Sequence, residues 1–321
     1  MTNDPALHLP TPTRSTRSAP TRSSSRTARA TRRRAVHLVA LVALVAVVAG
    51  CDLHRARPPG DAPLRYRDEV FADVAVTPGL PYGEAVTQEG ETQTLLLDLY
   101  RPVGDTVTAR PAIVWIHGGG FRQGTRTSPE IVDQATAFAR KGFVGVSISY
   151  RLTATGCFPV SASCLQAIID AKHDAQAAVR WLRANATTYG IDPTRIAAAG
   201  TSAGAITALN VGYGAEDVGD SGNPGHDSTI RAAVSLSGAR ILTRANPGEA
   251  AALLFHGTAD PIVAYASAIT TVDEARAAGL NAFLTTWEGD GHVPYVPHRQ
   301  EILDQTTNFL WWELQLGQAA R

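Results

Sequence analysis

The stretch RIAAAGTSAGAITALN, residues 195–210, decides the class of fold. A short apolar run is followed by Gly-Thr-Ser-Ala-Gly and then by a helical pattern, so it predicts a strand, a sharp turn and a helix. Gly200 and Gly204 stand two residues on either side of Ser202. Glycines there let strand and helix approach closely, while the turn holds the Ser202 hydroxyl clear of the backbone. A glycine-rich turn in which Ser202 only caps the helix is the alternative.

Outward from this stretch, short apolar segments alternate with helical ones. The apolar segments predict strands, and the longer periodic segments predict helices. Strands are expected at residues 66–76, 92–102, 112–117, 143–150, 195–200, 230–238, 251–257 and 281–289, and helices at 128–142, 165–190, 202–214, 261–279 and 298–317. This alternation predicts an α/β fold with a mostly parallel, eight-stranded sheet that helices cover on both faces. In such sheets ligands bind beyond the carboxyl ends of the strands.

Two further polar residues follow predicted strands. Asp260 comes after the strand ending in FHG, and His292 comes after the strand ending in WEG. A serine needs a base to become a nucleophile, and the base needs an orienting carboxylate. Ser202, His292 and Asp260 are therefore the predicted catalytic residues. The alternatives are structural: Asp260 only caps a helix before Pro261, and His292 is only a surface histidine.

Other acids and histidines compete for the same roles. The rival acids are Asp290 and Asp227, and the rival bases are His256 and His226. Asp290 is only two residues from His292, so its carboxylate is poorly placed to face the ring. His256 ends an apolar strand and is expected to pack beneath the site.

The order Ser, Asp, His resembles that of the α/β-hydrolase superfamily. The segment WIHGGGF, residues 115–121, is similar to the oxyanion loop of its carboxylesterase and hormone-sensitive-lipase-like branch. The resemblance runs from about Tyr66 to the C-terminus and includes SYRL at residues 149–152. It implies that the N–H groups of Gly119, Gly120 and Ala203 stabilise the oxyanion. It also implies that His117 braces the loop and is not the base.

Charge is distributed unevenly along the 321 residues, although the formal net charge is zero. Residues 1–50 hold eight arginines and one acid, Asp4, which leaves 21 basic and 28 acidic residues in the remainder. An acidic body of this kind gives no electrostatic reason to bind nucleic acid.

The N-terminus predicts export. TRRR at residues 31–34 precedes a short apolar run, so residues 1–50 read as a signal peptide with a basic n-region. The run ends in VAGC, which resembles a bacterial lipobox with Cys51 as the lipidated residue and membrane anchor. An uncleaved anchor or a plain secretory signal leading to secretion are the alternatives. Residues 52–63 are expected to be a tether, and residues 64–321 the catalytic domain.

The remaining cysteines, Cys157 and Cys164, predict a disulfide in an exported protein, with two free thiols as the alternative.

No metal and no organic cofactor are expected, because the triad chemistry needs neither. The predicted function is a serine carboxylic-ester hydrolase for small-molecule or polymer esters, with a small cap that favours short acyl groups. A secreted serine peptidase of the same fold and a catalytically silent binding protein are the alternatives. The sequence gives no oligomeric state.

Overall fold

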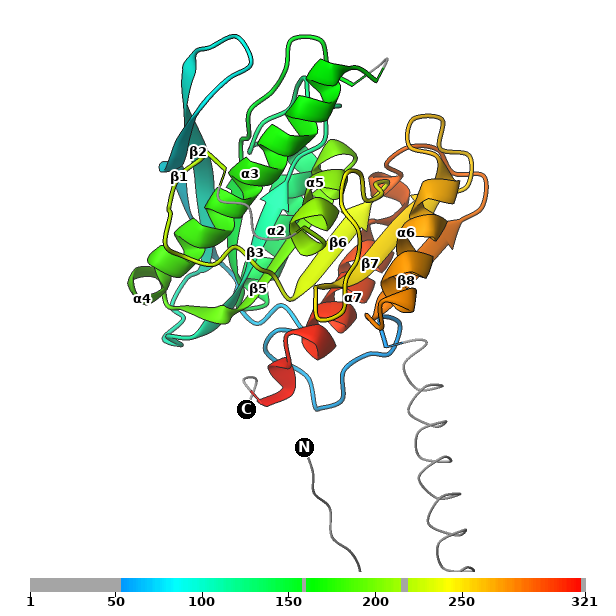
Figure 1. Cartoon of the computed structure of the whole chain (residues 1–321). Helices are drawn as coiled ribbons and strands as arrows, with labels where there is room; N and C mark the ends of the chain where they lie inside the picture. The colour runs from blue at the N-terminus through cyan, green and yellow to red at the C-terminus, as the bar shows by residue number, and fades with distance from the viewer. Residues whose placement is uncertain (1–52, 158–159, 215–218, 319–321) are drawn as a thin grey trace, which may run out of the picture. The chain divides into compact units, whose positions relative to one another are not determined.

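Eight strands form a single sheet in a computed structural model that describes residues 53–157, 160–214 and 219–318 (Figure 1). The strands are β1 Val74–Val86, β2 Thr92–Pro102, β3 Arg110–Ile116, β4 Val144–Ile148, β5 Ile191–Thr201, β6 Ala232–Leu236, β7 Ala251–Gly257 and β8 Ala282–Trp287. Their order across the sheet is β1-β2-β4-β3-β5-β6-β7-β8. β1 and β2 are antiparallel, β2 is antiparallel to β4, and all other neighbours are parallel. The expected mostly parallel, eight-stranded sheet is confirmed.

Helices cover both faces of this sheet. They are α2 Pro129–Arg140, α3 Ala162–Ala184, α4 Ala186–Tyr189, α5 Ala203–Gly212, α6 Tyr265–Ala277, α7 Tyr295–Glu313 and the 3₁₀ turn η2 Leu316–Gln318. α3, α5 and α6 pack on one face, and α2 and α7 pack on the other. Parallel neighbours require such crossovers, because a short hairpin joins only antiparallel strands.

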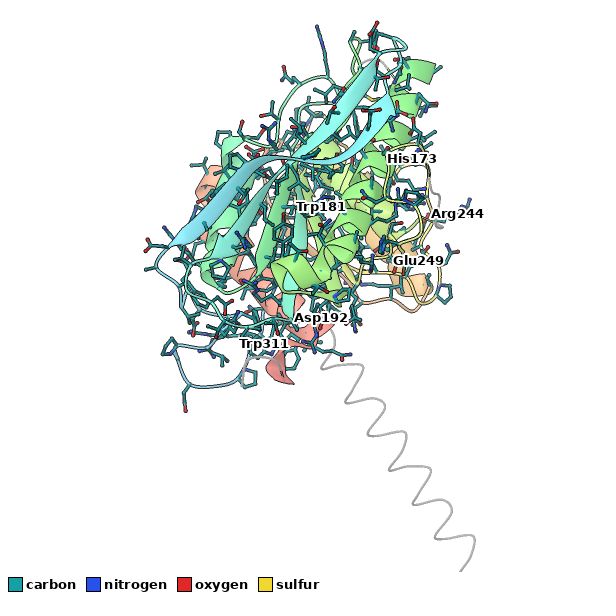
Figure 2. The ribbon with its side chains drawn as sticks, turned by 90° about the vertical axis from the view of Figure 1, so that its left-hand side faces the viewer. His173, Trp181, Asp192, Arg244, Glu249 and Trp311 are labelled. Atoms are coloured by element: carbon teal, nitrogen blue, oxygen red, sulfur yellow. A yellow bond between two sulfur atoms is a disulfide. The ribbon has the colours of Figure 1, made fainter. Side chains whose placement is uncertain are left out.

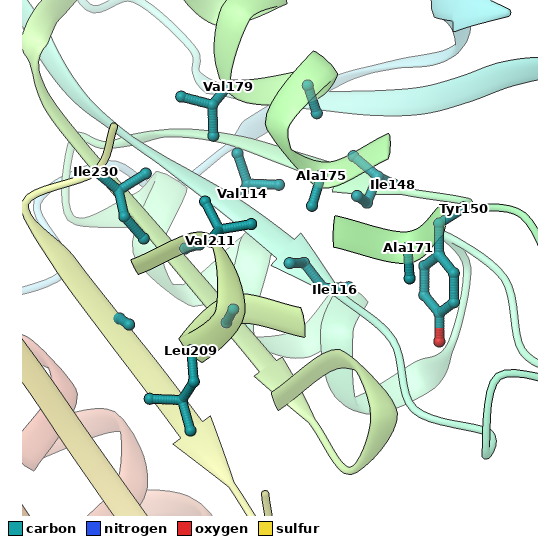
Figure 3. Close-up of a cluster of buried hydrophobic side chains, with 14 of the residues drawn as sticks. Val114, Ile116, Ile148, Tyr150, Ala171, Ala175, Val179, Leu209, Val211 and Ile230 are labelled. Carbon is teal, nitrogen blue, oxygen red and sulfur yellow. The ribbon is translucent and has the colours of Figure 1, made fainter. Parts of the chain in front are cut away.

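The core lies in two layers because side chains alternate along β3. Val114 and Ile116 point into the layer under α3 and α5, while Ile113 and Trp115 point into the layer under α2 and α7. Figure 3 shows the first layer, in which the β3 side chains meet Ala175 of α3. Small alanines on α3 and α5 bring these helices close to the sheet, so the ends of the strands are held firmly.

The first strand differs from its prediction. It covers Val74–Val86 instead of residues 66–76, and it contains Pro78 and Pro81. Register shifts interrupt its pairing with β2 beside these prolines. Proline is tolerated in an edge strand with bulges, where a missing N–H costs no ladder bond. Because the two prolines interrupt the hydrophobic pattern, the sequence did not predict this strand over its observed range.

Residues 53–63, which the sequence predicts to be a tether, are mostly exposed but contact the body at His54, Pro58 and Gly60. The His54 ring is buried and stacks on Phe283 at 4.7 Å between centroids. The buried Arg67 donates to the carbonyls of Pro58 and Gly60 at 3.0 and 2.7 Å. These contacts satisfy backbone groups that a linker leaves to water.

The predicted signal peptide, residues 1–50, and Cys51 lie outside the described residues. None of the described helices combines the length and apolar composition needed to cross a bilayer.

Candidate active site

Ser202 lies in the turn between β5 and α5, in a conformation that side-chain-bearing residues rarely adopt. Its φ is 52° and its ψ is −116°. A Cβ built on Gly204 would lie 2.1 Å from the carbonyl oxygen of Ile116, and one on Gly200 would lie 2.4 Å from the Gly204 carbonyl carbon. Only glycine fits at these two positions, as the sequence predicts. The Ser202 side chain makes no capping hydrogen bond to α5, which argues against the capping alternative.

His292 and Asp260 meet Ser202 from two loops that follow other strands. Nε2 of His292 lies 2.7 Å from the Ser202 Oγ, and Nδ1 of His292 lies 2.7 Å from Oδ2 of Asp260. The Asp260 side chain is fully buried, and that of His292 is 20% exposed. The structure therefore brings together the three residues predicted as catalytic, in one continuous chain of hydrogen bonds.

The loop that carries His292 is fixed to the neighbouring strand ends. The N–H of Val293 donates to Oγ of Ser237 at 2.9 Å, just beyond β6. A Cβ on Gly257, the last residue of β7, would lie 2.3 Å from the carbonyl oxygen of Asp290. Close backbone packing thus sets the position of the His292 ring.

Asp260 is a hydrogen-bonded carboxylate. Its Oδ1 accepts from the N–H groups of Ile262 and Val263 at 2.8 and 3.0 Å, and its Oδ2 faces His292. Burial by itself raises the pKa of Asp260, but the bonds from His292 and the two N–H groups outweigh burial and hold the pKa below its usual value. The helix α6 begins at Tyr265 with Ala264 as its cap residue, so Asp260 caps the preceding turn and not the helix.

The rival acids and bases have other surroundings. Asp290 pairs with His298, Asp227 accepts from Thr229, and His226 is exposed. His256 lies fully buried beneath Asp260, as its position at the end of an apolar strand predicts.

The glycine loop after β3 lies against Ser202. A Cβ on Gly118 would lie 3.3 Å from the Ser202 Cβ. Gly119 and Gly120 have φ values of 117° and 61°, which favour glycine. The N–H groups of Gly119, Gly120 and Ala203 donate no hydrogen bond within the described part of the chain. These three predicted oxyanion donors are free to serve a ligand.

His117 supports this loop from below. Its ring is buried, Nδ1 lies 2.6 Å from the Gly118 carbonyl oxygen, and Tyr150 stacks on it at 4.3 Å between centroids. Burial lowers the pKa of His117 to about 4, so the ring is neutral at pH 7. Tyr150 also donates to the His117 carbonyl at 3.0 Å. Sequence reasoning gave Tyr150 no role, although it is the last residue of the strand predicted at residues 143–150 and lies in the SYRL segment.

Two hollows meet at Ser202. An open cleft of about 720 Å³ contains polar groups, including Arg122, Gln123 and Glu130, beside the glycine loop. A smaller hollow of about 220 Å³ is almost wholly apolar. Its walls come from α3, α5 and the loops after β6 and β7, and include Val160, Leu165, Ile168, Ile206, Ile241 and Ile262.

Cys157 and Cys164 form the predicted disulfide and line the apolar hollow. The bridge joins the segment after β4 to the first turn of α3. Within the described residues, no group of three or more His, Cys, Asp or Glu side chains is arranged to hold a metal ion.

The fold is the α/β-hydrolase fold. Esterase 2 from Thermogutta terrifontis has the same fold, with a TM-score of 0.61 in its tabun-phosphoramylated form. The two chains are 24% identical over 82% of this chain and 98% of that one. Residues 97–247, which include Ser202 and the glycine loop, match the BD-FAE family model.

Curated relatives of the chain include two named as esterases and one named as a phenmedipham hydrolase. Carboxylesterase NlhH from Mycobacterium tuberculosis is 38% identical over 109 residues, which are 34% of this chain and 31% of the relative. Para-nitrobenzyl esterase from Bacillus subtilis is 26% identical over 239 residues, or 62% of this chain and 48% of the relative. Phenmedipham hydrolase from Pseudarthrobacter oxydans is 38% identical over 114 residues, which are 35% of this chain and 22% of the relative. The chain thus spans less than half the length of each of these relatives.

Proposed function

We propose that this protein is a serine carboxylic-ester hydrolase that uses Ser202, His292 and Asp260 as its catalytic triad. The observation that carries the proposal is the chain of two 2.7 Å hydrogen bonds from Ser202 through His292 to Asp260, at a strained turn beside a glycine loop. Carboxylesterase names among the relatives support the same reaction.

The geometry suits a two-step acyl transfer. Oγ of Ser202 attacks the ester carbonyl carbon while Nε2 of His292 takes its proton, and Asp260 holds the Nδ1–H. The carbonyl oxygen becomes an anion that the N–H groups of Gly119, Gly120 and Ala203 stabilise. The C–O bond of the ester then breaks, and the alcohol leaves with the proton from His292. Water, deprotonated by His292, releases the acid from Ser202 in the same way.

Each hollow is proposed to hold one part of the ester. The apolar hollow of about 220 Å³ takes the acyl group, and the polar cleft takes the alcohol part. This hollow is smaller than the roughly 300–1,000 Å³ of typical small-molecule pockets, so the acyl groups it holds are short. Activity on nitrophenyl esters from two to sixteen carbons is expected to peak at the short end.

A matched pair of variants tests the acyl assignment. Ile168→Ala enlarges the apolar hollow and shifts the optimum toward longer chains. Ile302→Ala truncates an equally buried side chain on the opposite face of the sheet, and it leaves the chain-length optimum in place. An optimum that moves equally in both variants, or in neither, contradicts the assignment.

The reaction class is tested with Ser202→Ala and a fluorophosphonate probe. The wild type is expected to bind the probe covalently and to hydrolyse short esters, and Ser202→Ala is expected to do neither. Cleavage of dipeptide amides without ester turnover would show a peptidase instead. Absence of both labelling and turnover in the folded wild type would show a binding protein.

We further propose that the protein is exported and anchored by lipid at Cys51. Only Asp52 separates Cys51 from Leu53, so the lipid would attach within about 7 Å of the folded body. Residues 53–71 contact Phe283 near the start of β8 and Arg140 at the end of α2, just before β4 begins. Ser202 lies at the other end of the strands, directly after β5. Trp311, which is labelled in Figure 2, lines the same hollow as Gly60, so this edge would face the bilayer and the site would face away from it. Mass spectrometry of the mature N-terminus tests the anchor, and an unmodified Cys51 would refute it.

A further inference from the structure

The Cys157–Cys164 disulfide lies where the two hollows beside Ser202 meet. Cys157 lines both the polar cleft and the apolar hollow, whereas Cys164 lines the apolar hollow alone. The other residues that line both hollows are Gly120, Ser202 and Ile262. Gly120 and Ser202 already have roles in the proposed reaction, so Cys157 and Ile262 supply the remaining side chains at the boundary between the hollows.

The segment that carries Cys157 is packed against the glycine loop. The N–H of Thr153 donates to the carbonyl of Phe121 at 2.8 Å. A Cβ built on Gly156 would lie 3.4 Å from the carbonyl oxygen of Gly120, which is an ordinary van der Waals contact. One end of the disulfide is therefore placed by the same loop that is proposed to bind the oxyanion.

The other end of the disulfide belongs to the helix that forms a wall of the apolar hollow. Cys164 lies in the first turn of α3, and its N–H donates to Oγ of Ser161, the cap residue, at 3.2 Å. Leu165 and Ile168 of the same helix line the apolar hollow. The bridge thus ties this wall to the segment that packs on the glycine loop.

A covalent tie and a polar tie join these two segments. Oγ1 of Thr153 and Oγ of Ser163 lie 2.9 Å apart, and a hydroxyl pair of this kind can break when a ligand pushes the segments apart. A disulfide cannot yield in this way, because it holds the Cα atoms of its cysteines within about 7 Å of each other. The width of the apolar hollow on this side is therefore set by the disulfide.

We propose that the Cys157–Cys164 disulfide determines the acyl specificity of the site, as a rigid wall between the apolar hollow and the polar cleft. This inference rests on the proposed esterase function and on the placement of the acyl group in the apolar hollow. An acyl chain that outgrows the hollow of about 220 Å³ meets two sulfurs that cannot separate. Without the bridge, the wall yields and a longer chain enters.

The experiment compares two double variants by the ratio of kcat/KM for an octanoyl nitrophenyl ester to that for a butanoyl ester. Cys157→Ser with Cys164→Ser removes the cross-link and little volume, and the ratio is expected to rise about tenfold, the lower end of the discrimination that a pocket achieves per methylene. Cys157→Ala with Cys164→Ala removes more volume and is expected to raise the ratio further.

Ile302→Ala is the matched control, because it truncates a buried side chain on the opposite face of the sheet. It is expected to lower the melting temperature, as the double variants do, and to keep the wild-type ratio. A ratio that stays unchanged in both double variants, or that rises equally in Ile302→Ala, would overturn the role of the disulfide. Free thiols in the folded wild type, detected by alkylation and mass spectrometry, would overturn it as well.

Calorimetric binding of butanoate and octanoate separates this inference from the proposed function, because it needs no turnover. The affinity for octanoate relative to butanoate is expected to rise about tenfold when serines replace both cysteines. An inactive wild type whose variants show this shift would refute the esterase proposal alone. An active wild type whose double variants keep the original affinity ratio would refute the role of the disulfide alone.

Discussion

Gly204→Ala is expected to disturb the oxyanion loop and the Ser202 turn together. The added Cβ would lie 2.1 Å from the carbonyl oxygen of Ile116 and 2.6 Å from that of His117. Both are backbone atoms, so β3 and α5 must separate by about 1 Å to reach an ordinary contact. Overpacking lowers the free energy of unfolding by about 1–3 kcal/mol, and we expect the upper value of about 3 kcal/mol because the added Cβ clashes with two backbone carbonyls. For a domain of this size that is roughly 6–12 °C in melting temperature.

The same displacement moves His117 and the glycine loop relative to Ser202. A misplacement of about 1 Å costs on the order of 100-fold in rate, so kcat/KM for a short ester is expected to fall by that factor. Gly291→Ala is the matched control, because a Cβ there meets nothing within 4 Å although the residue adjoins His292. Thermal melts and ester kinetics of both variants test the reasoning. A Gly204→Ala protein with the melting temperature and kcat/KM of the wild type would refute it.

Other variants test the supports of the site. Replacing both Cys157 and Cys164 by serine opens an eight-residue loop and is expected to cost about 2–3 kcal/mol in urea unfolding; no change in the midpoint would contradict this. Arg151→Leu leaves the buried Asp174, 2.8 Å from Nη2, without its cationic partner, and a loss of about 3–5 kcal/mol is expected. Burial lowers the pKa of His117 to about 4, so the buried neutral ring contributes its full share to the free energy of unfolding only above pH 6.5. As the pH falls from 6.5 to 4, this free energy is expected to decrease by about 3 kcal/mol. His117→Gln is expected to lack this part of the acid destabilisation in melts across that range.

The convergence of the three residues of the proposed triad was predictable from the sequence because parallel strands deliver their carboxyl ends to one edge. Ser202, Asp260 and His292 each follow an apolar strand, so their convergence needed only the strand pattern and the order along the chain. The disulfide followed from the cysteine spacing and from the expectation of export. In each case a local signal carried the information.

Other features depend on contacts between distant segments and left no local signal. The prolines of β1 are compatible with a strand only because it lies at the edge of the sheet. Residues 53–63 have the composition of a linker, and the buried Arg67 that binds their carbonyls became visible only in the fold. The contact of His256 with Asp260 likewise depends on how the turn at residues 260–263 folds back over β7.

Backbone strain gathers at the edge where these residues meet. Phe121, Ser202, Ser237 and Val293 all have positive φ values, between 52° and 60°, although none is glycine. Each such conformation costs on the order of 1–3 kcal/mol and persists only where its surroundings enforce it. The surroundings here are tight, since the N–H of Ser202 donates to the Leu236 carbonyl at 2.8 Å and that of Val293 donates to Ser237. Four strained residues from four loops around the proposed nucleophile are better explained by a reaction that needs fixed geometry than by packing, because unstrained turns would pack as well.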